Sequence, residues 1–272
     1  MRAVLALALA GAFALAIGFR TPACGQTYPL ATAPPRTIDP AALRRLAEAR
    51  EIHERFTRGL DAESRADWGA AAAHFERIVA LDPPEPQGST ARYDAAIAET
   101  HLAHYDRAIT LLHEALGRDP DFAAAAANLV TAAVYAGDEK TAREAADRFV
   151  AIAPASARAR YQRGLVALQA GDLTTARADF LVLIGNDPSY ATAHYDLAVV
   201  EIGDARLDAA QTELTRALEL SPGYARARFA LGTVLFRLGR RSEARAAFDR
   251  AATDASEPTL RDLALSIRDQ LK

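Results

Sequence analysis

Apolar residues along most of this chain recur three and four positions apart, and short polar turns interrupt the pattern. In residues 160–188 the apolar positions fall on one face of each of two helices, which meet at Gly171-Asp172 and end at Pro188. This spacing is the period of an α-helix and not that of a strand. Glycine can take the left-handed conformation that ends a helix, aspartate can cap the next helix, and proline cannot continue one. The segment therefore predicts a helix-turn-helix unit.

The unit recurs every thirty-four residues, marked by a small residue in the second helix and a proline after it. An alanine suits a close helix crossing, because a larger side chain would force the two backbones apart. Ala71 and Pro83 belong to the series once an insertion in residues 84–88 is allowed. The regular members are Ala108, Ala142, Ala176, Ala210 and Ala244, with Pro120, Pro154, Pro188 and Pro222.

A repeat of this length with these two marks resembles the tetratricopeptide repeat. The resemblance implies an all-α fold, a right-handed superhelical α-solenoid of helix-turn-helix repeats. Asp39-Pro40 predicts an early start for the first helix, so the repeats are expected to occupy residues 41–256. Residues 257–272 predict a C-terminal capping helix, because the open end of such a stack needs a polar outer face. The six repeats are expected at about 52–85, 89–122, 123–156, 157–190, 191–224 and 225–256.

The N-terminal residues are typical of an exported bacterial protein. Arg2 precedes an apolar run that ends at Phe19, and the small residues Ala23-Cys24-Gly25 follow. This order predicts a secretory signal peptide over residues 1–25, cleaved after Gly25. Residues 26–40 contain four prolines and predict a flexible linker. We therefore expect a periplasmic or secreted protein that is not inserted in the membrane after cleavage.

Two membrane-attached alternatives remain open. An uncleaved signal would anchor the chain by its apolar run. Cys24, the only cysteine, follows that run as the acylated cysteine of bacterial lipoproteins does, although residues 21–23 depart from the leucine-led motif of such sites. With a single cysteine, no disulfide can form within the chain.

Composition and motifs argue against several classes of function. The formal net charge is -3 and no run of Lys or Arg is present, so nucleic-acid binding is not expected. The six histidines form neither an HExxH motif nor a zinc pattern. Glycine-rich phosphate loops and GxSxG motifs are absent from the sequence. We expect no catalytic residues, no metal site and no cofactor, and therefore a protein that is not an enzyme.

The resemblance implies a concave groove lined by the first helix of each repeat. Five of the six repeats carry an aromatic residue at the fifth position of that helix. These rings either face the groove or pack between neighbouring first helices, since aromatic residues are often mostly buried. Nearby arginines would meet carboxylates of a partner. The predicted partner-binding residues are Phe56, Tyr93, Tyr161, Leu165, Tyr195, Val199, Phe229, Arg158, Arg226 and Arg237.

The sequence thus predicts a non-catalytic scaffold or assembly factor of the cell envelope that binds a protein or peptide in this groove. The carboxylate clamp of chaperone-binding members is not expected, because Asn128 alone fits its pattern. One alternative is a membrane-attached lipoprotein similar to pilotins and outer-membrane assembly helpers. Another is an enzyme-associated or cofactor-binding protein. Nothing in the sequence specifies an oligomeric state.

Overall fold

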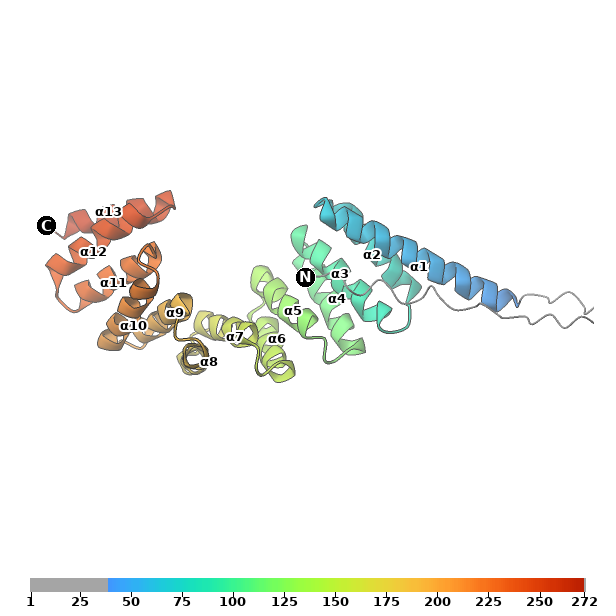
Figure 1. The fold of residues 1–272 in the computed structure, drawn as a ribbon, viewed down its shortest axis with the longest axis horizontal. Coiled ribbons are helices and arrows are strands. Elements are labelled where there is room, and N and C mark those ends of the chain that lie inside the picture. The colour runs from blue at the N-terminus through green and yellow to red at the C-terminus, as the bar shows by residue number, and fades with distance from the viewer. Residues whose placement is uncertain (1–38, 272) are drawn as a thin grey trace, which may run out of the picture. The chain divides into compact units, whose positions relative to one another are not determined.

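The computed structural model describes residues 39–271, and the predicted signal peptide and most of the predicted linker lie outside them. The described residues form thirteen α-helices and no strand, so the fold is an all-α solenoid of repeats (Figure 1). The contacts divide the chain into a unit that ends at Leu43 and a second that begins at Arg44 and holds the repeats. The helices are α1 (Pro40–Ser64), α2 (Trp68–Leu81), α3 (Gln87–His101), α4 (Tyr105–Arg118), α5 (Ala123–Ala136), α6 (Glu139–Ile152), α7 (Ala157–Gln169), α8 (Leu173–Asn186), α9 (Ala191–Gly203), α10 (Leu207–Leu220), α11 (Ala225–Arg237), α12 (Arg241–Asp254) and α13 (Pro258–Gln270).

Helices with odd numbers up to α11 are the first helices of their repeats, and each even-numbered helix is the second. From α2 onward every helix packs against the next one along the chain, ending with α13 on α12. The repeated alanine of the second helix is buried in each of the six repeats. No helix within residues 39–271 is both long enough and apolar enough to span a membrane.

Glycines in three first helices lie directly under a phenylalanine ring of the paired second helix. A Cβ atom added to Gly164 would lie 2.8 Å from Cε1 of Phe180, and one added to Gly232 would lie 2.9 Å from Cε1 of Phe248. Both rings are fully buried. The small residue is therefore required by the ring that covers it, in addition to the close crossing of the two helices.

The turn inside each repeat requires a left-handed residue. Gly171 has φ 77° there, and Asp172 then caps α8 by accepting a hydrogen bond from the backbone N–H of Thr175 at 3.1 Å. Ala103 and Ala205 occupy the same position in other repeats with φ 62° and 56°. Left-handed backbone costs an L-residue roughly 1 to 2 kcal/mol, because its Cβ crowds the following carbonyl oxygen. Those two turns are therefore strained.

Candidate functional site

The first helices of neighbouring repeats touch one another directly. Beyond the contacts between successive helices, α3 contacts α5, α5 contacts α7, α7 contacts α9 and α9 contacts α11. Side chains from several repeats therefore share one surface, which we call the first-helix surface. All ten residues of the predicted partner-binding set belong to first helices.

The predicted aromatic residues on this surface are neither fully buried nor fully exposed. Phe56, Tyr93, Tyr161, Tyr195 and Phe229 are all partly buried. Each ring contacts at least one other ring, with centroid distances from 4.9 Å for Tyr93 and Phe122 to 6.2 Å for Tyr161 and Phe180. These rings therefore support the packing of their repeats and still present part of their surface to solvent.

The remaining predicted residues divide into apolar and basic positions. Val199 is partly buried, and Leu165 is 37% exposed. Arg226 is exposed and pairs with Glu257, with 2.7 Å between Nη2 and Oε1. Arg237 donates to the backbone carbonyl of Ile202 at 3.3 Å. Arg158 is exposed and forms no ion pair with another described residue.

A groove follows the first-helix surface across α3, α5 and α7. It consists of one hollow of about 510 Å³ between α3 and α5 and another of about 360 Å³ between α5 and α7. Tyr135 lines both hollows, is 65% exposed, and stacks on Tyr105 with 5.5 Å between ring centroids. We call this feature the central groove. Its lining residues include Ile97, His101, Asn128, Thr131, Val134, Tyr135, Gln162 and Leu165.

Gln162, in the lining of the central groove, makes hydrogen bonds through one side-chain atom and leaves the other without a partner within residues 39–271. Nε2 of Gln162 donates to the carbonyl of Ala127 and to Oγ1 of Thr131, both at 3.2 Å. These bonds join α7 to α5. Oε1 of Gln162 is buried and has no hydrogen-bond partner among the described residues. An amide oxygen accepts hydrogen bonds, so this buried atom lacks, in the described part of the chain, a partner that its chemistry allows.

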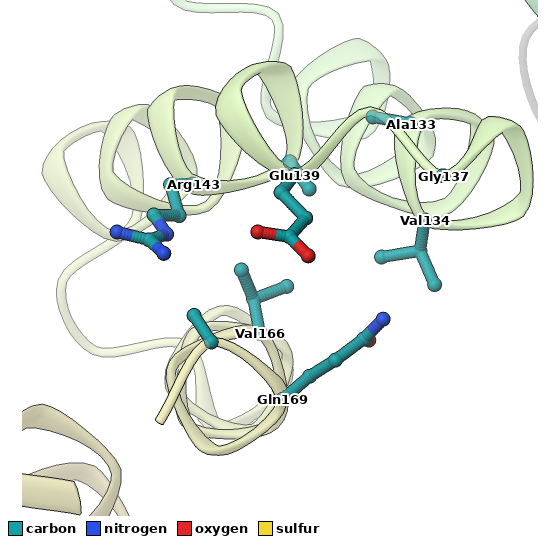
Figure 2. Close-up of a pocket in the computed structure, with 9 residues that line it drawn as sticks. Ala133, Val134, Gly137, Glu139, Arg143, Val166 and Gln169 are labelled. Atoms are coloured by element: carbon teal, nitrogen blue, oxygen red, sulfur yellow. The ribbon is translucent and has the colours of Figure 1, made fainter. Parts of the chain in front are cut away.

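A smaller pocket lies beside the groove, between α5, the start of α6, and α7. Figure 2 shows Val134 and Val166 facing each other across it, with Gln169 beside them and Glu139 and Arg143 at its edge. Its cavity volume of about 20 Å³ is close to that of a single water molecule. This pocket is too small for a side chain of a partner.

A second polar centre lies further along the surface, at α7, α9 and α11. Asp196 of α9 is 7% exposed, and its Oδ2 atom is buried with no hydrogen-bond partner among the described residues. The hydroxyl of Tyr161, from α7, is within hydrogen-bonding reach of the carboxyl. Burial raises the pKa of Asp196 to about 6. Tyr190 and Tyr224 occupy the N-cap positions of α9 and α11, and neither side chain makes a capping hydrogen bond.

The tyrosines around this carboxyl stay neutral over a wide pH range. Burial, and after it the charge of Asp196, raises the pKa of Tyr161, Tyr190 and Tyr195. The same causes raise the pKa of Tyr224 to about 12. We call Asp196 and these four tyrosines the Asp196 site.

Sequence reasoning identified Tyr161, Tyr195 and Leu165 as surface residues but did not identify Tyr135 or Asp196 as site residues. Tyr135 stands near the end of its helix, outside the positions considered. Asp196 follows Tyr195 directly, and the signal that could have revealed it is a carboxylate next to the helix position that carries Tyr161 and Tyr195 in register. Within residues 39–271 no three His, Cys, Asp or Glu side chains lie close enough together to hold a metal ion.

Comparison with known protein families agrees with the repeat pattern. One model described as tetratricopeptide repeat matches residues 56–121 and 127–191, and a second with the same description matches residues 201–264. The chain belongs to the tetratricopeptide repeat family. No curated protein matches this tetratricopeptide repeat chain.

Solved tetratricopeptide structures share the fold at low sequence identity. A tetratricopeptide repeat protein from Parabacteroides merdae aligns with a TM-score of 0.71 at 14% identity, over 81% of this chain and 86% of that one. YrrB, described as a TPR protein with an unusual peptide-binding site, aligns at 0.59 and 18% identity, over 73% of this chain and all of that one. MamA aligns at 0.57 and 24% identity, over 61% of this chain and 91% of that one. At these identities the likeness concerns the fold alone.

Proposed function

We propose that this tetratricopeptide protein is a non-catalytic scaffold or assembly factor that binds a segment of another protein in the central groove. The observation that carries the proposal is the groove itself, with the exposed ring of Tyr135 between two hollows of about 510 and 360 Å³. Aromatic rings and a few placed polar groups in a concave surface are typical of peptide-binding sites. The peptide-binding site named for YrrB supports the same class of ligand.

The groove favours an extended or helical segment with apolar side chains. Val134 and Leu165 are 38% and 37% exposed in it, next to the 65% exposed Tyr135. Charged residues are few among the groove residues, so the contact is dominated by apolar area and aromatic faces. Large rigid rings of this kind supply much of the binding energy in protein interfaces.

A capture experiment tests the proposal. The tagged chain, without residues 1–25, is incubated with an envelope extract, and captured proteins are identified and their affinity measured. Replacing Tyr135 and Leu165 together by alanine should weaken capture about thirtyfold, which is a loss of roughly 2 kcal/mol. Folding should change little, because both side chains are substantially exposed.

Leu181 offers a matched control. It is 52% exposed and lies on α8, a second helix outside the groove. Leu181→Ala should leave capture unchanged. Equal capture by wild type and the Tyr135/Leu165 double variant would refute binding in the central groove.

The place of action that we propose is the cell envelope, after export and cleavage. Support comes from the basic start, apolar run and small residues of the first 25 positions. Intact-mass measurement of protein from the periplasmic fraction should then give a chain that begins at Gln26. A mass that includes an acyl group on Cys24 would favour the lipoprotein alternative, and a full-length mass would favour an uncleaved anchor.

A further inference from the structure

Asp196 differs from the other buried acidic side chains of residues 39–271 in having no basic partner. Glu99 contacts His104 at 2.7 Å, and Asp179 contacts Arg163 at 2.7 Å. Glu201 is held by Arg177 at 3.0 Å. Burying a carboxylate costs free energy unless a cation or several hydrogen bonds compensate it. Asp196 therefore lacks the basic partner that Glu99, Asp179 and Glu201 each have.

The surroundings of Asp196 are suited to a cation. Tyr161 and Tyr190 have ring centroids 5.9 Å apart, and those of Tyr195 and Tyr224 are 5.1 Å apart. All four rings are partly exposed, so the cluster, which comes from α7, α9 and the residues just before α9 and α11, reaches solvent. The face of a tyrosine ring attracts cations within about 6 Å of its centroid. The faces of the rings and the carboxylate thus both attract a positive charge.

The other charged groups near the site do not neutralise Asp196. Burial and the Tyr161 hydroxyl are the influences on its pKa, and no cation is among them. The charge of Arg226, at the start of α11, lowers the pKa of Tyr195 and Tyr224, but its guanidinium is paired with Glu257. Asp187, in the loop before α9, raises the pKa of Tyr190 by its charge and so adds a second negative charge near the site.

We propose that the Asp196 site binds a lysine or arginine side chain of the protein partner, with its charged group over the tyrosine rings. This presupposes the protein-binding function proposed above and adds the chemistry of one residue of the partner. The cation does not need to touch the buried Oδ2 atom, because both the attraction to the rings and the attraction to the carboxylate act over several ångströms. The site recognises charge, and the central groove recognises apolar side chains.

An NMR titration with short probes tests this recognition. The chain without residues 1–25 is titrated with the capped tripeptides Gly-Lys-Gly and Gly-Arg-Gly, and with the same peptide carrying norleucine. The basic probes should shift the ring signals of the four tyrosines, and the norleucine probe should not. Equal shifts from the norleucine and the lysine probe would overturn the proposal.

Variants then assign the binding to the carboxylate and the rings. Asp196→Asn keeps the shape of the side chain and should weaken binding of the lysine probe about tenfold or more. Asp262→Asn removes the same charge from an exposed position of α13 and should leave binding unchanged. Tyr195→Leu removes one ring without changing the carboxyl and should also weaken binding. Unchanged binding in Asp196→Asn, with a melting temperature at least equal to that of wild type, would overturn the proposal.

The pH dependence provides an independent readout. The lysine probe stays protonated below its ordinary pKa of about 10.4. Its affinity should fall as the pH drops through about 6, where Asp196 gains a proton. The Asp196→Asn variant should lack this dependence. An affinity for wild type that is constant across this range would contradict a role for the Asp196 charge.

Capture of the partner separates this inference from the proposed function. If Tyr135 and Leu165 are needed for capture while Asp196→Asn leaves both capture and probe binding intact, the groove function stands and the cation site is refuted. If Asp196→Asn weakens both capture and probe binding while the Tyr135/Leu165 variant captures normally, the cation site is supported and the central groove is not the binding surface.

Discussion

The buried carboxyl of Asp196 should make the folded protein less stable as the pH rises. Its pKa is about 6 in the folded chain, against an ordinary value of 3.8. The folded state therefore holds this proton more tightly than the unfolded state does. The resulting stabilisation is fully present below the ordinary pKa and is lost as the pH rises through about 6. A difference of about two pKa units corresponds to at most about 3 kcal/mol.

The substitution Asp196→Asn isolates this contribution, because asparagine has nearly the same shape and does not ionise. At low pH the variant and wild type should have similar free energies of unfolding. At neutral pH the variant should be more stable by about 1 to 3 kcal/mol, since the wild type then carries an ionised carboxylate in a buried site. Other carboxylates titrate in both proteins and cancel in the difference.

Urea unfolding of both proteins, followed by circular dichroism at several pH values, measures this difference. Repeat arrays do not always unfold in one step, so amide hydrogen exchange in α9 should accompany it. Asp262→Asn serves as the control and should show no comparable gain. A difference between wild type and Asp196→Asn that does not grow with pH would refute the reasoning.

Three further predictions concern packing and strain. Ala176 is fully buried at the crossing of α7 and α8, so Ala176→Leu should cost about 1 to 3 kcal/mol of unfolding free energy, whereas Ala178→Leu at an exposed position of α8 should cost little. Ala205 has φ 56°, so Ala205→Gly should raise the melting temperature through a gain of about 0.5 to 1 kcal/mol, and a loss would show that the turn is unstrained. Replacing Tyr161 and Tyr195 by alanine should lower the melting temperature and also weaken partner binding by about 2 kcal/mol, because both rings are packed and partly exposed. Retained affinity in that double variant would restrict the rings to a structural role.

The fold could be predicted from sequence because its packing constraints recur at fixed positions. Gly164 must be small since the ring of Phe180 lies on it, and Ala176 must be small since two helices cross there. Each constraint involves residues of a single repeat. Because the small residues recur at a fixed spacing, these packing constraints can be recognised from the sequence alone.

The contents of the binding surface could be predicted only in part, because they depend on several repeats at once. Tyr135 becomes important because Tyr105 stacks beneath it and because hollows open on both of its sides. Asp196 becomes unusual because Tyr161 of the preceding repeat and Tyr224 just before α11 lie near it without supplying a cation. No local pattern in the sequence records these combinations.

Helix α7 contributes residues to both candidate binding sites, and this arrangement limits which residue types the bound segment of a partner can carry. Gln162 and Leu165 of α7 line the central groove, whereas the neighbouring Tyr161 belongs to the Asp196 site. A bound segment that crosses α7 would therefore meet exposed apolar surface on the side of α5 and a buried negative charge on the side of α9. The two proposals together predict that such a segment carries apolar residues followed or preceded by a lysine or arginine. A partner whose bound segment is acidic throughout would be repelled by the Asp196 charge and would be incompatible with joint use of both sites.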